Sequence, residues 1–226
     1  MAAVLILTFL SVAVAGGLLY LVFNLMTEYK PGKKKVQQDL KQMKDKLGSY
    51  TKDLVPINKE ELELFSLSQI HQLSKKKKTR TARGVYTTIF HEPILAYSYK
   101  RYLSSGLNAV LYARTADHEF AFRIQGKEVK VVIDNQLAGT IKNNDTFYSI
   151  RDNRVVAQIN RSNTAYLPVL VNNKEVAQVS MPVTGNKEKL LSSRAFTFIK
   201  SDIGKEEEKL LLSLSILELV NREVDS

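Results

Sequence analysis

The order of apolar and polar residues divides the chain into three stretches with different patterns. Residues 2–26 are almost wholly apolar. Polar and charged residues then dominate as far as residue 83, and beyond it short segments alternate between apolar and polar positions. The pattern predicts a transmembrane anchor over 1–27, a basic, partly helical connector over 28–83, and a β-barrel domain with a C-terminal helix over 84–226.

The third stretch has the alternation and the β-branched and aromatic residues that are typical of β-strands. Eleven segments fit this pattern. They are residues 85–90, 94–101, 109–114, 119–124, 128–133, 136–142, 147–151, 155–161, 166–171, 175–180 and 195–200. Many short strands without helices between them indicate an antiparallel barrel or sandwich.

Three of the predicted hairpins form an internal repeat. VVIDNQLAGTI, YSIRDNRVVAQI and VLVNNKEVAQV each contain an apolar strand, an Asx-rich turn and a second strand with an alanine. These alanines, Ala138, Ala157 and Ala177, are 19 and 20 residues apart. Asx pairs tolerate the left-handed conformations that tight hairpins require. The predicted turns are Asp134-Asn135, Asp152-Asn153 and Asn172-Asn173.

The end of the chain differs from the strands before it. After Gly204, glutamates at 206–208 suit the start of a helix, and the following KLLLSLSILELV is apolar on every side of a helical wheel. A strand is the alternative, because residues 212–216 also alternate. The run is too short to cross a bilayer, so a helix here needs enclosure by protein. The predicted fold class is therefore mainly β: an N-terminal single transmembrane helix, then a closed antiparallel barrel of about 11–12 strands around a hydrophobic C-terminal helix.

The N-terminal stretch has the length of a membrane span. At ~1.5 Å of rise per residue it reaches ~37 Å, more than the hydrocarbon core of ~30 Å. A cleaved signal peptide is the alternative, but no basic residue precedes the stretch. Lys30, Lys33, Lys34 and Lys35 follow it. The positive-inside rule then predicts a single-pass membrane protein whose C-terminal domain is cytoplasmic.

The connector contains two predicted helices. Between residues 36 and 47, apolar residues recur at helical spacing. This stripe fits a contact with a partner helix or a membrane surface, but it is too short for a coiled coil, which favours a helix packed on its own domain. Asn58 can cap a second helix. The buried side of that helix would be formed by Leu62, Phe65, Ile70 and Leu73.

Composition narrows the possible functions. The chain contains no cysteine, which excludes disulfides, Cys-ligated metal sites and thiol nucleophiles. Its net charge is +10, but residues 28–83 hold 15 Lys and Arg against 7 Asp and Glu, whereas residues 84–226 hold 18 against 16. The basic excess therefore lies in the connector. Because no aromatic residues are interleaved with it, it does not indicate nucleic-acid binding.

The densest basic cluster is SKKKKTRTAR, near the end of the connector. Such a run is often only a solvated linker, but cations beside a membrane gain about 1 kcal/mol each when they contact anionic lipid. We therefore predict a membrane-surface contact. Its residues are Lys30, Lys33, Lys34, Lys35, Lys75, Lys76, Lys77, Lys78, Arg80 and Arg83.

The sequence shows no catalytic or metal-binding constellation. His71, His91 and His118 lie in three separate segments, and none has a second histidine at metal-ligand spacing. Glycine-rich nucleotide loops and the nucleophile elbow are absent. Ser213 and Ser215 have no histidine or lysine placed to activate them. We predict no enzymatic activity, no metal and no cofactor.

A barrel of about twelve antiparallel strands around a hydrophobic C-terminal helix resembles the tubby-like superfamily, which includes the tubby, LURP-one-related and phospholipid-scramblase groups. The resemblance rests on IDNQLAGTI, IRDNRVVAQI, LVNNKEVAQV and the terminal LLLSLSILELV, and covers roughly residues 82–223. The domain is short for that family, and its predicted membrane helix is N-terminal, whereas scramblases carry one at the C-terminus. The resemblance implies membrane-proximal behaviour, including the phosphoinositide binding of tubby proteins, and assigns no binding residue in this chain.

Together these features predict a membrane-anchored, non-enzymatic interaction module, acting as an accessory or scaffolding subunit of a membrane complex. Its partners would be the lipid bilayer and a membrane protein, and not nucleic acid. The alternative is a lipid-binding or lipid-sensing module that recognises anionic headgroups through the basic cluster at 75–83.

Overall fold

The computed structural model describes residues 29, 31–76, 81–163, 165–181 and 194–225. Within these residues, a single antiparallel sheet of twelve strands runs in the order of the sequence, from β1 to β12. The strands are β1 (Phe65–Lys76), β2 (Thr81–Thr88), β3 (Pro93–Arg101), β4 (Asn108–Arg114), β5 (Glu119–Gln125), β6 (Glu128–Ile133), β7 (Gln136–Lys142), β8 (Thr146–Ser149), β9 (Val155–Ile159), β10 (Tyr166–Val171), β11 (Lys174–Ser180) and β12 (Phe196–Ile199). The helices are α2 (Lys33–Leu47), α3 (Lys59–Glu63) and α5 (Lys205–Asp225).

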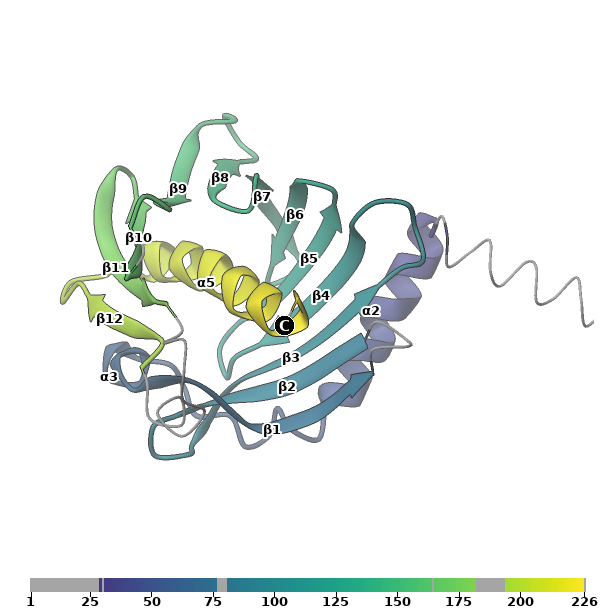
Figure 1. The fold of residues 1–226 in the computed structure, drawn as a ribbon, viewed down its shortest axis with the longest axis horizontal. Helices are drawn as coiled ribbons and strands as arrows, with labels where there is room; N and C mark the ends of the chain where they lie inside the picture. The colour runs from purple at the N-terminus through teal and green to yellow at the C-terminus, as the bar shows by residue number, and fades with distance from the viewer. Residues whose placement is uncertain (1–28, 30, 77–80, 164, 182–193, 226) are drawn as a thin grey trace, which may run out of the picture.

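The sheet curls around α5, and its first and last strands almost meet (Figure 1). At the seam, Ser66 in β1 forms an isolated antiparallel bridge with Arg194, just before β12. Beside it, the backbone N–H of Ala195 donates a hydrogen bond of 2.6 Å to the carbonyl oxygen of Phe65. The barrel is therefore nearly closed, with these contacts joining its two edges.

The core of the barrel is formed by the inward faces of the strands and by α5. In β5 the burial alternates, with Phe120, Phe122 and Ile124 directed to the interior. Residues 211–220 of α5 are all buried, as expected of a helix that is apolar on every side. The inward-facing side chains of the strands and the apolar surface of α5 therefore bury each other, because the strands surround the helix and the helix fills the interior of the barrel.

The three repeat units are the hairpins β6–β7, β8–β9 and β10–β11, as predicted. Their turns contain Asx residues with positive φ, among them Asn135 (64°), Asn153 (53°) and Asn173 (62°). Each unit also carries a β-bulge three residues after that Asx. The pairing skips Ala138, Val156 and Val176 in turn. Bulges add local twist and bend, so the repeat builds the same curvature into three successive hairpins.

Helix α2 packs on the outside of the barrel wall, against β3 and β4. Met43 and Leu47 are buried in a second hydrophobic cluster with residues of the wall such as Val110 and Tyr112. This confirms the predicted helix over 36–47 and its packing against its own domain. Asp39, also on α2, is buried and accepts a hydrogen bond of 2.8 Å from the hydroxyl of Tyr102.

The prediction of a second helix in the connector is wrong beyond the first helical turn. Asn58 does cap a helix, and its side chain accepts hydrogen bonds from the backbone N–H groups of Glu60 and Glu61. However, α3 ends at Glu63, and the chain then enters β1, which pairs with β2. The sheet edge offers a ladder of backbone hydrogen bonds, which overrides the weak helical spacing of this segment.

Two parts of the predicted fold class are corrected: the N-terminal transmembrane helix and the complete closure of the barrel. Residues 1–27, over which the transmembrane helix was predicted, lie outside the described residues. None of the helices in the described part of the chain combines the length with the apolar composition that a membrane crossing demands. A closed barrel was predicted, whereas the observed barrel is only nearly closed. The fold is thus mainly β, with a nearly closed twelve-stranded antiparallel barrel and a C-terminal helix.

Candidate functional site

The repeat turns gather at the end of the barrel where α5 begins, which we call the entry rim. A cavity of about 450 Å³ opens there between the turns of all three repeat hairpins and the first residues of α5. We call it the rim cavity. Its lining residues are Ile133, Asp134, Gln136, Leu137, Ala138, Phe147, Ser149, Ile150, Arg151, Val156, Asn172, Glu206, Lys209 and Leu210. This volume is within the range of small-ligand pockets, ~300–1,000 Å³.

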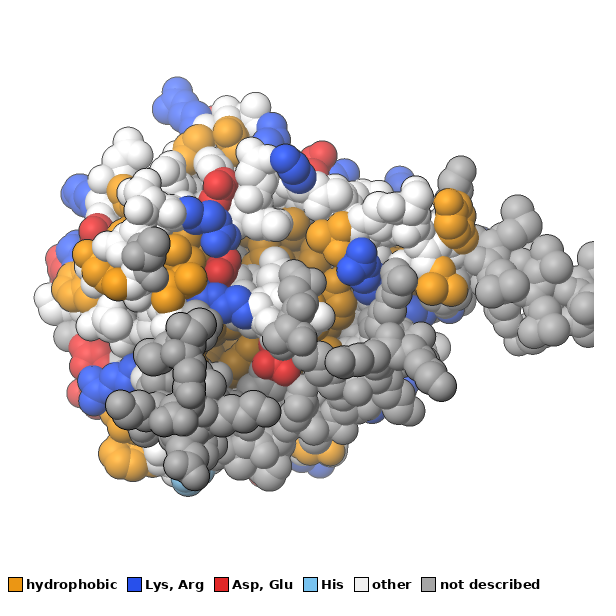
Figure 2. Space-filling model, in the orientation of Figure 1, with side chains coloured by type: hydrophobic (Ala, Val, Ile, Leu, Met, Phe, Trp, Pro, Cys, Tyr) orange, Lys and Arg blue, Asp and Glu red, His pale blue; other side chains and the backbone are white. Residues whose placement is uncertain are grey.

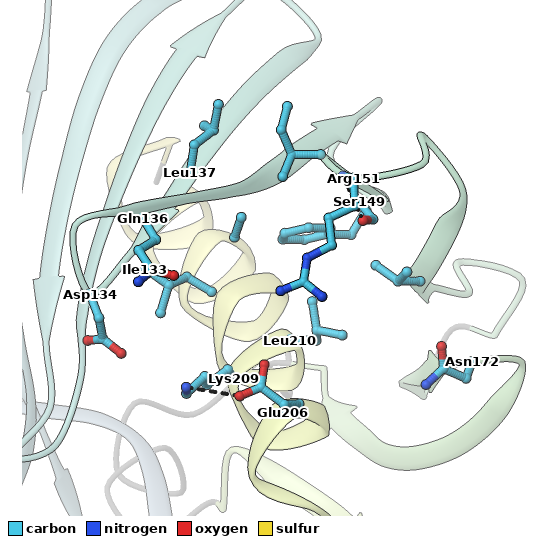
Figure 3. Close-up of a pocket in the computed structure, with 14 residues that line it drawn as sticks. Ile133, Asp134, Gln136, Leu137, Ser149, Arg151, Asn172, Glu206, Lys209 and Leu210 are labelled. Carbon is cyan, nitrogen blue, oxygen red and sulfur yellow. Dashed lines mark hydrogen bonds and ion pairs between the residues drawn. The ribbon is translucent and has the colours of Figure 1, made fainter.

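Half of the residues that line the rim cavity are apolar, and the other half are polar or charged (Figure 3). Phe147 is fully buried beneath it, and Ile133 is 8% exposed. On the α5 side, the Lys209 ammonium lies 3.1 Å from a carboxylate oxygen of Glu206. The Arg151 side chain extends from the β8–β9 turn across the cavity toward Leu210 (Figure 3). Arg151 makes no ion pair with any residue that the structure describes.

Three apolar side chains at the entry rim are exposed to solvent. Leu137 is 47% exposed, Ile150 is 55% exposed and Val155 is 43% exposed. The backbone N–H of Ile150 bonds to the carbonyl oxygen of Ala138, which places it next to Leu137. We call these three residues the rim patch. Figure 2 shows hydrophobic side chains in the middle of one face, with Lys and Arg spread around them and not gathered in one area.

A glycine allows the wall of the cavity to pack tightly. Gly139, in β7, lies beside Ser149 in the β7–β8 ladder. A Cβ atom added at Gly139 would collide with the backbone carbonyl of Tyr148 and with the ring of Phe147. The close approach of β8 to β7 therefore depends on glycine at this position.

A polar cluster borders the rim cavity at the β4–β5 turn. The Nδ1 atom of His118 lies 2.8 Å from a carboxylate oxygen of Asp134, and the other oxygen of Asp134 accepts the Glu119 backbone N–H. Burial raises the pKa of the Asp134 carboxyl, but these two donors more than offset it and hold the pKa below its ordinary value. The contacts join the β4–β5 and β6–β7 turns. They lie beside a smaller cavity of about 210 Å³.

A second charged group holds the C-terminal half of α5 at the opposite end of the barrel. Glu218 is 8% exposed and accepts hydrogen bonds of 2.6 Å from Arg161 and 2.8 Å from Arg222. Arg222 also donates to the carbonyl oxygen of Ser180 at the end of β11. Burial raises the pKa of Glu218, but the two guanidinium groups lower it below its ordinary value. We call these three side chains the Glu218 clasp.

The predicted membrane-contact residues fall partly within the described chain. Lys33 and Lys34 are exposed at the start of α2, and Lys35 lies 3.6 Å from Asp39. Lys75 and Lys76 end β1, and Arg83 is half-buried in β2. Lys30, Lys77, Lys78 and Arg80 lie outside the described residues.

The structure brings the two basic stretches to the same end of the barrel. Asp39, one helical turn after Lys35, lies 3.2 Å from the ammonium of Lys100. Lys100 pairs with Thr81 across β3 and β2, and Thr81 pairs with Lys76 across β2 and β1. A continuous path of neighbours therefore links the lysines of α2 with the basic β1–β2 hairpin, opposite to the entry rim. We call this region the basic corner.

The three histidines and the two serines considered above lie on separate elements. His118 is engaged with Asp134, His91 lies in the β2–β3 turn with φ of 71°, and the side chain of His71 lies outside the described part of the chain. Among the described residues, no group of three or more His, Asp or Glu side chains is arranged to hold a metal ion. Ser213 and Ser215 are fully buried on α5.

The rim cavity was not predicted from the sequence. The signal was present in the repeat: hairpins that follow one another in a meander place every second turn at the same end, so three equivalent turns had to meet. What the spacing could not give was the position of the first residues of α5, which form the other wall. No family model, curated protein or solved structure matches this chain. The interpretation of the site therefore rests on its own residues.

Proposed function

We propose that this chain is a non-enzymatic interaction module, serving as an accessory or scaffolding subunit that binds a partner protein through the rim patch. The observation that carries this proposal is the exposure of Leu137 and Ile150 side by side at one end of the barrel, with Val155 exposed on the same hairpin as Ile150. Apolar side chains clustered at a surface favour binding, because a partner that covers them removes them from water. Isolated exposed apolar residues elsewhere on a protein carry no such meaning.

We also propose that the barrel is of the tubby-like type. This is supported by sequential antiparallel strands that surround a hydrophobic C-terminal helix. The support is architectural, and the proposed binding function does not depend on it, since one fold hosts many functions.

Site-specific photo-crosslinking in native cells tests the interaction role. A photoreactive residue at Ile150 should give a discrete protein adduct, and Leu137→Asp in the same chain should abolish it. The matched control is a photoreactive residue at Leu103, which is 43% exposed near the opposite end of the barrel. Equal adducts at Ile150 and Leu103, or an adduct at Ile150 that survives Leu137→Asp, would contradict the proposal.

A second candidate is recognition of anionic lipid through the basic corner. It is favoured by Lys33, Lys34 and Lys41, which are exposed on α2 and make no ion pair with any residue that the structure describes. Each cation near an anionic surface contributes about 1 kcal/mol, and salt screens the contribution. The full chain should then bind vesicles containing phosphatidylserine more strongly than neutral vesicles, with a difference that disappears at high salt.

Replacing the three exposed lysines together by glutamine should remove most of that binding. The matched control is Lys127→Gln with Lys130→Gln, which removes exposed charges from the β5–β6 hairpin. If the control lowers vesicle binding as much as the α2 variant, binding depends on total charge and not on the basic corner.

A further inference from the structure

We propose that the rim cavity is a binding site for a small amphipathic monocarboxylate, with its hydrocarbon part on the apolar floor and its carboxylate on Arg151. This site shares Leu137 and Ile150 with the rim patch, but its ligand is a small molecule and not a protein. Its test does not depend on any partner being found.

The apolar requirement follows from the lining. Ile133, Leu210, Ala138 and Val156 supply the apolar part of the lining, which we call the apolar floor. Phe147 also belongs to the lining and is fully buried. A ligand without a hydrocarbon part would displace water from these surfaces and offer nothing that packs against them. The volume of about 450 Å³ admits a short chain or a single ring.

The charge requirement follows from the edge of the cavity. The Lys209 ammonium is neutralised by Glu206 at 3.1 Å, and Asp134 is held by His118 at 2.8 Å. Arg151 remains as the cation at the cavity with no described ion-pair partner. A single negative charge on the ligand balances the positive charge of Arg151, whereas the second negative charge of a dianion would be repelled by Glu206 and Asp134. The planar guanidinium matches a carboxylate with two parallel hydrogen bonds.

Octanoate, octanol and octylamine have carbon chains of equal length and carry a negative charge, no charge and a positive charge. They therefore separate the apolar requirement from the charge requirement. Each is titrated into the full chain while NMR spectroscopy follows the methyl groups of Ile, Leu and Val residues. We expect octanoate to shift the signals of Leu210, Val156 and Ile133, to bind more tightly than octanol, and to bind much more tightly than octylamine. Equal affinities for octanoate and octylamine, or shifts confined to other methyl groups, would overturn the proposal.

Two arginines of the same turn provide a matched pair of variants. Arg151→Gln should weaken octanoate binding roughly threefold to fivefold, the size of one exposed ion pair, and leave octanol binding unchanged. Arg154→Gln is the control, because Arg154 faces Asp152 at 3.5 Å and does not line the cavity. Equal effects of the two substitutions would refute the role of Arg151.

A third variant tests the cavity itself. Ala138→Phe places a ring in the space between the β6–β7 hairpin and α5, and should abolish the binding of octanoate and of octanol together. The same NMR spectra report whether this variant is folded. Continued octanoate binding by a folded Ala138→Phe variant would place the ligand elsewhere and overturn the proposal.

Discussion

Removing the carboxylate of Glu218 is the most direct test of what holds α5 inside the barrel. The side chain of Glu218 is 10% exposed and accepts one hydrogen bond from each of two arginines. The Arg161 side chain is 39% exposed, so water screens that pair and it contributes about 0.2–1 kcal/mol. The Arg222 side chain is 18% exposed, and its charge-assisted bond contributes about 1.5–3 kcal/mol. Glu218→Ala should therefore destabilise the chain by roughly 2–4 kcal/mol.

Urea unfolding of the full chain, followed by far-UV circular dichroism, measures this loss. The chain contains no tryptophan, so tyrosine fluorescence is the second probe. The control is Glu206→Ala on the same helix: its side chain is 86% exposed and pairs with Lys209, so its loss should change stability by less than about 0.5 kcal/mol. A double-mutant cycle with Arg161→Ala isolates one of the two contacts. If Glu218→Ala lowers the free energy of unfolding no more than Glu206→Ala does, the two arginine contacts do not hold α5 in the barrel.

Further predictions concern the wall, the core and the response to acid. Gly139→Ala should destabilise the chain by about 1–3 kcal/mol or more in urea unfolding, because the new Cβ meets a backbone carbonyl that cannot move away cheaply. The Ser215 hydroxyl is buried without a hydrogen-bond partner among the described residues. Ser215→Ala should thus leave stability unchanged or raise it by up to about 1 kcal/mol, and a clear loss would reveal an overlooked partner. Asp39→Ala should free α2 from the wall, seen as faster amide hydrogen exchange in α2 with little change in the barrel, since its contacts to Lys100 and Tyr102 are lost. The pKa of Asp134 is below its ordinary value in the folded chain, so its contribution to stability is complete above about pH 5 and is lost as the pH falls below about 4. In Asp134→Asn the urea midpoint should depend less on pH across this interval, and an unchanged dependence would contradict the assignment.

The strands were predictable because their sequence carries the burial pattern directly. Glu128–Ile133 begins with alternating polar and apolar residues, Tyr166–Val171 is rich in apolar and β-branched residues, and an Asx turn follows each strand, so the predicted and observed limits agree. The C-terminal helix was equally visible, because a short segment that is apolar on all sides has few places to be buried.

Other parts of the fold depend on contacts that the local sequence does not contain. The segment from Phe65 to Leu73 was expected to continue a helix, and it forms most of β1 because a neighbouring strand was available to pair with it. The bulges at Ala138, Val156 and Val176 share one position in the repeat. Apolar residues stand next to one another there, but such a pair does not by itself distinguish a bulge from a regular strand. The candidate site was the least predictable part, since Arg151 and Lys209 line one cavity only after the whole meander has closed around α5.

The position of α5 inside the barrel has a consequence for the order in which the chain can fold during synthesis. Each hairpin joins strands that are neighbours in sequence, so strands β2 to β11 can pair locally while the ribosome is still translating. The helix that fills their concave side is made after all of these strands, from Lys205 onward. Until it leaves the ribosome, the nascent sheet exposes phenylalanines and valines that belong to the finished core. A ribosome that stalls within the codons for α5 would therefore release a sheet with an exposed apolar interior, the kind of intermediate that chaperones bind and proteases remove.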